Sequence, residues 1–215
     1  NSKAYLTHDE VITLFHEFGH GLHHLLTEVT EYSISGIKGV EWDAVELPSQ
    51  FMENFAWDTN VVRQMSQHVD TGKSLPEDLL SKLEASRVFQ SGLQMVRQIE
   101  FSLFDWRIHA EYDPSRGPRI REIQREVREK VSVIETPTFS RIANSFSHVF
   151  GGGYAAGYYS YKWAEVLAAD AFAAFEEHGV FDRKVADRFR HTILEIGGTR
   201  DIAEAFREFR GRSPR

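Results

Sequence analysis

The feature that most constrains this chain is a pair of histidines in the stretch H-E-F-G-H at residues 16–20. In an α-helix, residues four apart lie on one face, so the imidazoles of His16 and His20 can take adjacent corners of a tetrahedral zinc site. Glu17 lies beside them, where its carboxylate can take a proton from an activated water without binding the metal. The spacing predicts a helix that carries a catalytic zinc site, and the plain alternative is a surface helix with these residues by coincidence.

The residues around the motif favour a helix. Thr7 and Glu10 have the spacing of a capping box, which marks a helix start. Apolar residues then recur at helical intervals, at Val11, Phe15, Phe18, Leu22 and Leu25. We interpret His23 and His24 as supporting or solvated groups, because a ligand pair of His20 and His24 would have no carboxylate between its members to act as a base.

The composition is that of a folded, acidic protein. With 215 residues, 41% of them hydrophobic and 13% aromatic, the chain can bury a core and fits one large or two small domains. A formal net charge of −7 argues against a nucleic-acid or anionic-membrane partner, and no apolar run is long enough to span a bilayer. Because the chain has no cysteine, zinc must be held by His, Glu or Asp. The same absence fits a reducing compartment, so we expect a cytoplasmic protein.

A second acidic stretch offers the third metal ligand. We predict a helix from about Asp43 to Trp57, bent near its start by a proline. Two histidines and one carboxylate would leave one coordination position open, as catalytic zinc sites do. The residues by themselves do not decide among Glu41, Glu46 and Glu53 as that carboxylate. Asp43 and Glu53 compete to accept the remaining N–H of a ligand histidine.

One segment has the pattern of a β-strand. Residues from Glu31 to Gly36 alternate polar and apolar side chains, and a turn is expected from Gly36 to Gly39. Such an edge could hold a substrate backbone beside the metal, and an ordinary connection is an equal alternative. The fold class predicted is therefore mainly α, with the motif helix in a zinc-peptidase catalytic domain and at most a short β element.

The rest of the chain has helical patterns. A long helical region is expected from Pro76 to about Tyr112, broken at Gly92. We expect its aromatic residues to lie in the core, namely Phe89, Phe101, Phe104 and Trp106. Further helices are expected at about 119–130, where the charges indicate a solvated face, and at about 161–175, 183–195 and 201–209.

A glycine-rich stretch near residue 150 has a different character. His148 is followed by glycines 151–153 and by tyrosines that include Tyr154, Tyr158 and Tyr161. Consecutive glycines cost conformational entropy, which fits a loop that flexes or approaches a ligand closely. Hydroxyl and imidazole groups on it could donate hydrogen bonds to a developing oxyanion. The alternatives are a linker before a helix whose tyrosines simply pack, and a phosphate loop, which would need a GK[ST] ending.

Taken together, these stretches resemble the catalytic motifs of the thimet-type oligopeptidases, a family of zinc metallopeptidases. The motifs are H-E-F-G-H at 16–20, D-A-V-E-L-P-S-Q at 43–50 and the segment 148–161, in the family's order, and the resemblance is strongest to the oligopeptidase A group. It implies one zinc ion per chain, bound by His16, His20 and Glu46. It also implies that Glu17 is the general base.

The same resemblance implies roles for the loop and for the chain as a whole. Residues that contact the substrate or stabilise the transition state would be His148, Tyr154 and Tyr161, with Tyr158 a weaker candidate. The activity would be that of a zinc metalloendopeptidase on short oligopeptides, with release of C-terminal dipeptides as a second outcome. Residues 1–215 would be the C-terminal catalytic portion of a longer protein, whose N-terminal part completes a channel for short peptides.

Two other classes of protein compete with this interpretation. A ferritin-like di-iron bundle needs Glu-x-x-His on two helices. Glu17 and His20 supply it once, and no other histidine has a glutamate three residues before it. The other rival is a non-catalytic helical interaction module derived from the same fold, and the intact ligand, base and tyrosine positions argue against it.

Overall fold

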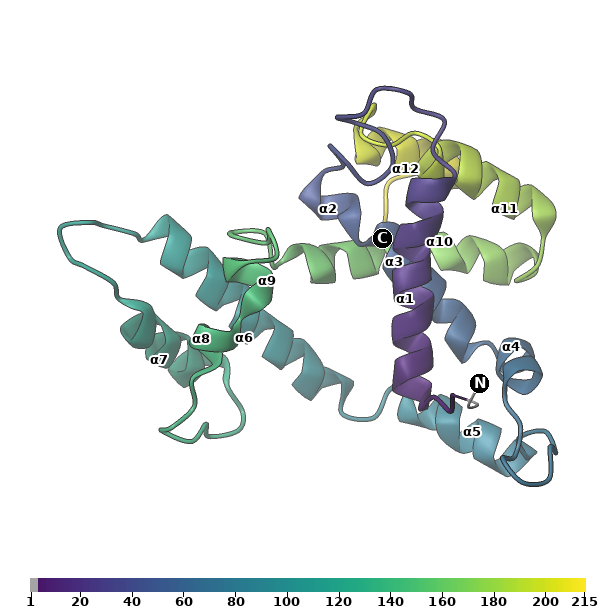
Figure 1. The fold of residues 1–215 in the computed structure, drawn as a ribbon, viewed down its shortest axis with the longest axis horizontal. Helices are drawn as coiled ribbons and strands as arrows, with labels where there is room; N and C mark the ends of the chain where they lie inside the picture. Colours follow the sequence, from purple (N-terminus) through teal and green to yellow (C-terminus); the bar gives the residue numbers. More distant parts are fainter. Residues whose placement is uncertain (1–3) are drawn as a thin grey trace. The chain divides into compact units, whose positions relative to one another are not determined.

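The computed structural model describes residues 4–215, and this part of the chain contains helices, turns and loops but no strand (Figure 1). The prediction of a mainly α fold is therefore confirmed. The chain divides into two compact units, the first made of the residues up to Glu84 together with Trp163–Arg215, and the second of Ala85–Lys162. Across residues 4–215, no helix is both long enough and apolar enough to cross a membrane.

The first unit carries the motif helix and most of the hydrophobic core. Its elements are α1 (His8–Leu25), α2 (Trp42–Val45), α3 (Leu47–Glu53), the 3-10 helix η1 (Asn54–Trp57), α4 (Thr59–Met65), most of α5 (Glu77–Ser86), most of α10 (Ser160–His178), α11 (Arg183–Phe189), the π-helix η2 (Arg190–Leu194) and α12 (Ile202–Arg210). The helices predicted at about 161–175, 183–195 and 201–209 are thus confirmed.

Helix α1 begins where its sequence predicts. The side chain of Thr7 accepts a hydrogen bond from the backbone N–H of Glu10, at 3.3 Å between Oγ1 and N. In return, Oε2 of Glu10 accepts from the backbone N–H of Thr7 at 2.7 Å. This reciprocal capping box satisfies two donors that a helix N-terminus otherwise leaves free.

The predicted helix from Asp43 to Trp57 is interrupted at Glu46. Glu46 ends α2 and precedes α3, with φ −91° and ψ 0°. The break follows from Pro48, which lies in the first turn of α3 and has no N–H to donate to the residue four positions earlier. One helix therefore ends, and the next begins, at the residue that was predicted to bind zinc.

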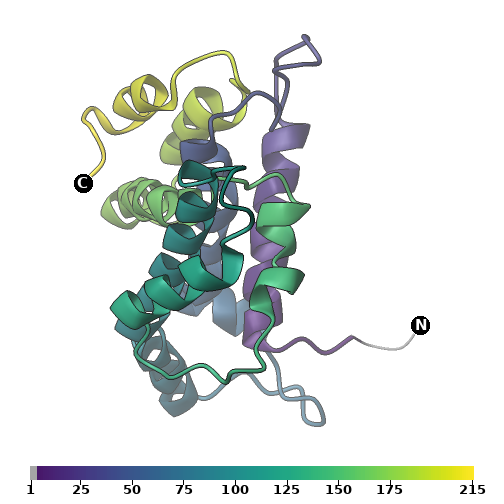
Figure 2. The same cartoon turned by 90° about the vertical axis from the view of Figure 1, so that its left-hand side faces the viewer.

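The segment from Glu31 to Gly36 is not a strand, contrary to its alternating pattern. It forms consecutive turns, and Gly36 and Gly39 adopt left-handed conformations with φ of 60° and 71°. Figure 2 shows a loop beyond the C-terminal end of α1 in this region. The carbonyl of Ile34 accepts from the backbone N–H of Gly198 at 2.8 Å, so the segment is held by a distant loop and not by a neighbouring strand.

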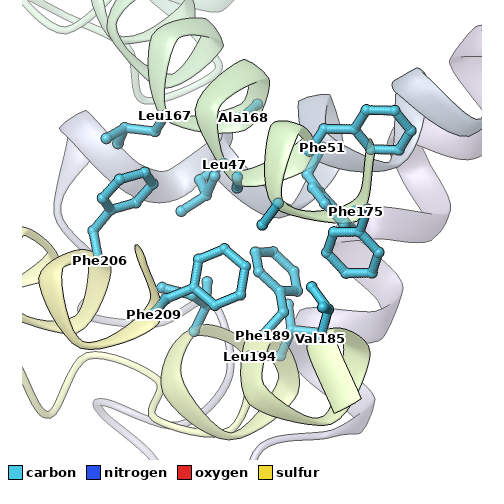
Figure 3. Packing of buried hydrophobic residues seen from close by; sticks show 14 of the residues in the cluster. Leu47, Phe51, Leu167, Ala168, Phe175, Val185, Phe189, Leu194, Phe206 and Phe209 are labelled. Carbon is cyan, nitrogen blue, oxygen red and sulfur yellow. The ribbon is translucent and has the colours of Figure 1, made fainter. Parts of the chain in front are cut away.

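The core of the first unit fixes α3 against the C-terminal helices. Leu47 and Phe51 of α3 point into a cluster with side chains from α10, α11 and α12 (Figure 3). The ring of Phe51 stacks on that of Phe189, with 4.2 Å between centroids. Full burial of a phenylalanine contributes about 1.5–3 kcal/mol, so this cluster anchors the helix that follows Glu46.

The second unit contains α6 (Ser91–Ala110), α7 (Ile120–Val131), α8 (Ile142–Ser145) and α9 (Ser147–Phe150). The predicted break at Gly92 is wrong, because Gly92 lies inside α6 and the interruption comes just before, where Gln90 has a left-handed φ of 56°. A buried cluster joins Phe104 of α6 to Ile123 and Val127 of α7, so α7 is solvated on only one face.

The aromatic residues expected in the core are divided between core and surface. Phe104 is buried and Phe101 packs against the same cluster, as predicted. Phe89 and Trp106 are 71% and 55% exposed, so the prediction is wrong for these two. Phe89 precedes α6, and Trp106 lies next to the buried Asp105 on a different face of that helix.

Helices α1 and α3 approach so closely that only a glycine fits between them. A Cβ atom at Gly19 would lie 2.5 Å from Cα of Ser49 and would also collide with the carbonyl group of Pro48. Both neighbours are backbone atoms, which cannot move aside as a flexible side chain can. The glycine at this position of α1 therefore sets the distance between the two helices.

We expect Gly19→Ala to lower the free energy of unfolding by about 1–3 kcal/mol, the usual cost of inserting an atom into a packed contact. Gly21→Ala is the matched control, since no atom lies within 4 Å of a Cβ at that position of the same helix. It should stabilise the helix by roughly 0.5–1 kcal/mol. Urea unfolding of the two metal-free variants measures the difference, and equal stabilities would contradict the close contact.

Candidate metal centre

Three side chains of the first unit converge on one point. Nε2 of His16 and Nε2 of His20 each lie 3.2 Å from Oε2 of Glu46. The two imidazole rings stand nearly perpendicular, at 84°, with centroids 5.0 Å apart. One ligand atom from each of the three residues lies within 4.8 Å of the other two. These are the residues that the family resemblance selects as metal ligands.

The spacing of these atoms fits a tetrahedral zinc site. With metal–ligand bonds of about 2.0–2.1 Å, adjacent corners of a tetrahedron lie about 3.3–3.4 Å apart. The two nitrogen–oxygen separations of 3.2 Å are close to that edge length. Two imidazole nitrogens and one carboxylate oxygen also match the donor set of catalytic zinc sites, which keep a fourth position open.

Glu46 is held as a buried carboxylate at the junction of α2 and α3. Only 1% of its surface is exposed. The buried hydroxyl of Ser49 donates to Oε2 of Glu46 at 2.7 Å and lies 3.0 Å from the backbone carbonyl oxygen of the same residue. A buried carboxylate is costly unless neighbouring groups donate to it. Ser49 supplies one donor, and a metal cation would supply the compensating charge.

His16 contacts a second carboxylate through its other ring nitrogen. Its Nδ1 lies 2.6 Å from Oε1 of Glu53, so the structure assigns this contact to Glu53 in the competition with Asp43. Burial, the largest influence on the pKa of His16, lowers it, but Glu46 and Glu53 together outweigh burial and raise the pKa to about 9. In the metal-free protein near neutral pH, a proton on His16 therefore provides positive charge that a bound cation would replace.

Glu17 stays outside the converging group. It is exposed on α1 and is not one of the three residues that present ligand atoms to one another. A general base must keep its carboxylate free of the metal, so this location is compatible with the role that its sequence position predicts.

The two histidines that follow the motif have different environments. His24 is exposed, as expected of a solvated group. His23 is only 2% exposed, so for this residue the solvated interpretation is wrong, and neither ring nitrogen has a hydrogen-bond partner. Burial, with a smaller contribution from His20 and His24, lowers the pKa of His23 to about 4. The helical spacing from Gly19 to His23 could have indicated this buried face.

The predicted loop residues lie together in the second unit. The ring of His148 is 6.1–6.2 Å, between centroids, from those of Tyr154, Tyr158 and Tyr161. Tyr154 and Tyr161 stack on each other at 5.0 Å. Tyr158 is buried, which raises its pKa, and its hydroxyl donates to Oε1 of Gln98 at 3.0 Å. Its side chain thus belongs to the core, in line with its weaker candidacy.

The glycines of this loop are required by close contacts and backbone conformation. A Cβ at Gly152 would lie 3.0 Å from Cα and 3.1 Å from the carbonyl oxygen of His148. Gly153 has a left-handed φ of 89°, which side-chain-bearing residues adopt only at a cost. The glycines therefore let the loop fold back tightly on His148.

The buried imidazole of His23 predicts acid sensitivity. Because its pKa falls from about 6.5 in an unfolded chain to about 4 in the folded one, its contribution to stability is complete above pH 6.5 and is lost as the pH falls toward 4. We expect the metal-free protein to lose unfolding free energy over this range more steeply than His23→Leu does. Urea unfolding at a series of pH values measures both slopes, and equal slopes would show that His23 does not carry this dependence.

Comparison with known proteins identifies the family of this chain. Residues 1–215 match the model of Peptidase family M3. The chain is 54% identical to oligopeptidase A of Salmonella typhimurium over 98% of its own length and 31% of that protein. It is 36% identical to dipeptidyl carboxypeptidase of Escherichia coli (99% and 31%) and to the thimet-like oligopeptidase of Dictyostelium discoideum (99% and 32%). It thus spans about a third of the length of these curated relatives. The predicted resemblance to the thimet-type oligopeptidases, oligopeptidase A among them, is confirmed, and the chain belongs to Peptidase family M3.

Proposed function

We propose that this chain is the catalytic part of a zinc metallopeptidase that hydrolyses peptide bonds in short oligopeptides. The observation that carries the proposal is the position of Oε2 of Glu46, 3.2 Å from Nε2 of both His16 and His20. This arrangement offers zinc three ligands and leaves a fourth position for water or a carbonyl oxygen. One zinc ion per chain follows from the single cluster of this kind within residues 4–215.

In this proposal the residues of the first unit have separate catalytic and supporting roles. When bound, zinc lowers the pKa of a water molecule toward neutrality and polarises the peptide carbonyl. Glu17 takes the proton of the attacking water and later passes it to the leaving amine. Glu53 fixes the ring orientation of His16 through Nδ1, and Ser49 holds the carboxylate of Glu46. This route needs no covalent intermediate.

The loop of the second unit supplies hydrogen-bond donors to the substrate in this proposal. His148, Tyr154 and Tyr161 have the side chains that could stabilise an oxyanion, and their correspondence to the third family motif supports the role. Their clustering supports it further, because the rings hold one another in fixed orientations. Tyr158 has a packing role in this proposal and no catalytic one, since its hydroxyl already donates to Gln98.

The proposed substrates are short peptides, and the proposed location is the cytoplasm. Relatives of this chain are named oligopeptidase A and dipeptidyl carboxypeptidase, so internal cleavage and release of C-terminal dipeptides are both candidate activities. We propose that an N-terminal part of the same protein completes the substrate channel, as the shorter span relative to these proteins suggests. A digest of mixed peptides by the full-length protein, read by mass spectrometry, distinguishes internal from C-terminal cleavage.

Neither rival class is favoured by the site. Ferritin-like di-iron proteins use a carboxylate-rich set from four helices, whereas the cluster here has two histidines and one carboxylate. A non-catalytic module would have no reason to keep a buried carboxylate facing two imidazoles, because that arrangement is costly without a cation.

Substitution of a ligand and of the base should have opposite effects on zinc content. We expect His20→Ala to lose most of the zinc, because two protein ligands remain. Glu17→Gln should keep zinc and lower peptide hydrolysis at least about a hundredfold, the low end of what a general base supplies. Metal analysis and kcat of the full-length variants measure both. Full zinc in His20→Ala, or loss of zinc in Glu17→Gln, would show that the ligand assignment is wrong.

The contact between Glu53 and His16 should be visible in metal affinity. We expect Glu53→Gln to weaken zinc binding by about 10–100-fold, the usual effect of losing a carboxylate that orients a ligand histidine. Asp43→Asn is the comparison variant and should weaken zinc binding less than Glu53→Gln does, because Glu53 makes the contact with Nδ1 of His16. Competition titration with a chelator measures both constants. A larger loss in Asp43→Asn than in Glu53→Gln would reverse the assignment.

A further inference from the structure

A buried carboxylate of the second unit holds the backbone of the tyrosine loop. Asp105, on α6, is only 1% exposed. Its Oδ1 accepts from the backbone N–H of Ala156 at 2.9 Å, and its Oδ2 accepts from the backbone N–H of Tyr158 at 2.9 Å. Nδ1 of His109, one turn further along α6, lies 3.1 Å from Oδ1. Each carboxylate oxygen therefore accepts a hydrogen bond from the backbone of the loop between residues 154 and 161.

The partners of Asp105 distinguish it from two other buried carboxylates, Glu100 and Asp170. Glu100 on the same helix pairs with Arg97 at 3.0 Å and with Arg128 at 2.9 Å. Asp170 in the first unit pairs with Arg210 and Arg212. Within residues 4–215, no arginine or lysine pairs with Asp105, and its carboxylate contacts two backbone amides of the loop and the imidazole of His109. A charge buried in this way stabilises the particular loop conformation that presents those amides.

That loop conformation is strained at the residue that Asp105 holds. Ala156 has a left-handed φ of 56°, which costs a residue with a Cβ roughly 1–2 kcal/mol. Such residues persist only where neighbouring contacts compensate for the strain. The hydrogen bonds from Ala156 and Tyr158 to Asp105 provide that compensation, since without them the carboxylate would be buried with few donors.

The two backbone amides that donate to Asp105 lie in the sequence between Tyr154 and Tyr161, the tyrosines proposed to act in catalysis. The backbone N–H of Gly157 donates to the carbonyl of Tyr154 at 2.8 Å, and the N–H of Ser160 donates to the carbonyl of Gly157 at 3.0 Å. The rings of Tyr154 and Tyr161 stack at 5.0 Å across this turn. The conformation of Ala156 to Tyr158 thus sets how the two rings face each other.

We propose that Asp105 is a positioning residue, a buried carboxylate that fixes the tyrosine loop in the conformation in which Tyr154 and Tyr161 act. The proposal rests on the proposed function, in which these hydroxyls contribute to catalysis. Asp105 does not touch the substrate in this account, and its effect passes through the backbone of the loop.

The first experiment uses Asp105→Asn in the full-length protein. Asparagine keeps the shape but presents an NH₂ group to one of the two backbone donors, so that hydrogen bond is lost. We expect kcat to fall by about 10–100-fold, where the upper figure is the usual effect of removing one hydrogen-bond donor to an oxyanion. KM and zinc content should stay within about twofold of wild type. Hydrogen exchange at the amides of Ala156 and Tyr158 should become faster. Unchanged kcat or unchanged amide protection would overturn the proposal.

Glu100→Gln is the matched control for general destabilisation. It removes a buried charge from the same helix and breaks ion pairs to Arg97 and Arg128, so the melting temperature should fall. Its kcat and its amide exchange at 156 and 158 should stay within about twofold of wild type, because Glu100 accepts from two arginine side chains and not from the backbone amides of the loop. An equal loss of kcat in this variant would assign the effect of Asp105→Asn to loosening of the whole unit and overturn the proposal.

A double-mutant cycle tests whether Asp105 acts through the tyrosines. In a background with Tyr154→Phe and Tyr161→Phe, Asp105→Asn should cost little further kcat, because residues that act as one unit are not additive. Fully additive losses would overturn the positioning role. If the two tyrosine substitutions leave kcat unchanged, the tyrosines have no role in the proposed mechanism, and Asp105 has none to support. If they lower kcat while Asp105→Asn does not, only the positioning role fails.

A second variant covers the case in which Asp105→Asn does not fold. Asp105→Glu keeps the charge and both acceptor oxygens but moves them by one methylene, which displaces the loop while satisfying its amides. We expect a folded protein with reduced kcat and unchanged zinc content. Wild-type kcat in Asp105→Glu would show that the exact loop placement is unimportant and would overturn the proposal.

Discussion

The contact between α1 and α3 at Gly19 is the constraint on which the candidate site depends. His16 and His20 lie on either side of this glycine in the sequence, and the backbone of Pro48 and Ser49 packs where a side chain would otherwise be. Because Glu46 directly precedes α3, the approach of that helix carries its carboxylate to both imidazoles. The core around Phe51 then holds α3 from its other side. The ligand distances are thus a consequence of backbone packing, and Gly19 contributes to the site without any side chain.

The buried carboxylates of the chain show what each location requires. Asp170 and Glu100 have arginine partners, and such ion pairs satisfy charge without specifying a ligand. Glu46 faces two imidazoles and a hydroxyl, an arrangement whose charge balance in the metal-free protein needs a proton on His16. Asp105 faces backbone amides of a strained loop. The chemical type of the partner therefore separates carboxylates that support the fold from those that shape a candidate functional site.

Local signals in the sequence predicted the fold well, and non-local contacts explain its errors. The capping box of Thr7 and the periodicity of α1 act within a few residues, so the motif helix is placed correctly. The turns from Glu31 to Gly36 depend on Gly198, far along the chain, and alternation of side chains cannot reveal that partner. Exposure of Trp106 has the same origin, because an aromatic residue does not by itself say which helix face is buried. Choosing Glu46 among three glutamates needed the family motif, and the structure then brings Oε2 of Glu46 to 3.2 Å from Nε2 of both histidines.

The loop residues illustrate a further limit of sequence reasoning. His148, Tyr154 and Tyr161 attract attention because glycines and tyrosines are unusual together, whereas Asp105 is a single aspartate in a helix with no motif around it. Its partners lie 51 and 53 residues away, and the strain at Ala156 cannot be read from the letter alanine. A metal ligand is recognised by residue type and spacing, but a residue that positions a loop is recognised only by what its buried atoms contact. The first kind of residue can be found in a sequence, and the second requires a structure in which every buried charge is matched to its partners.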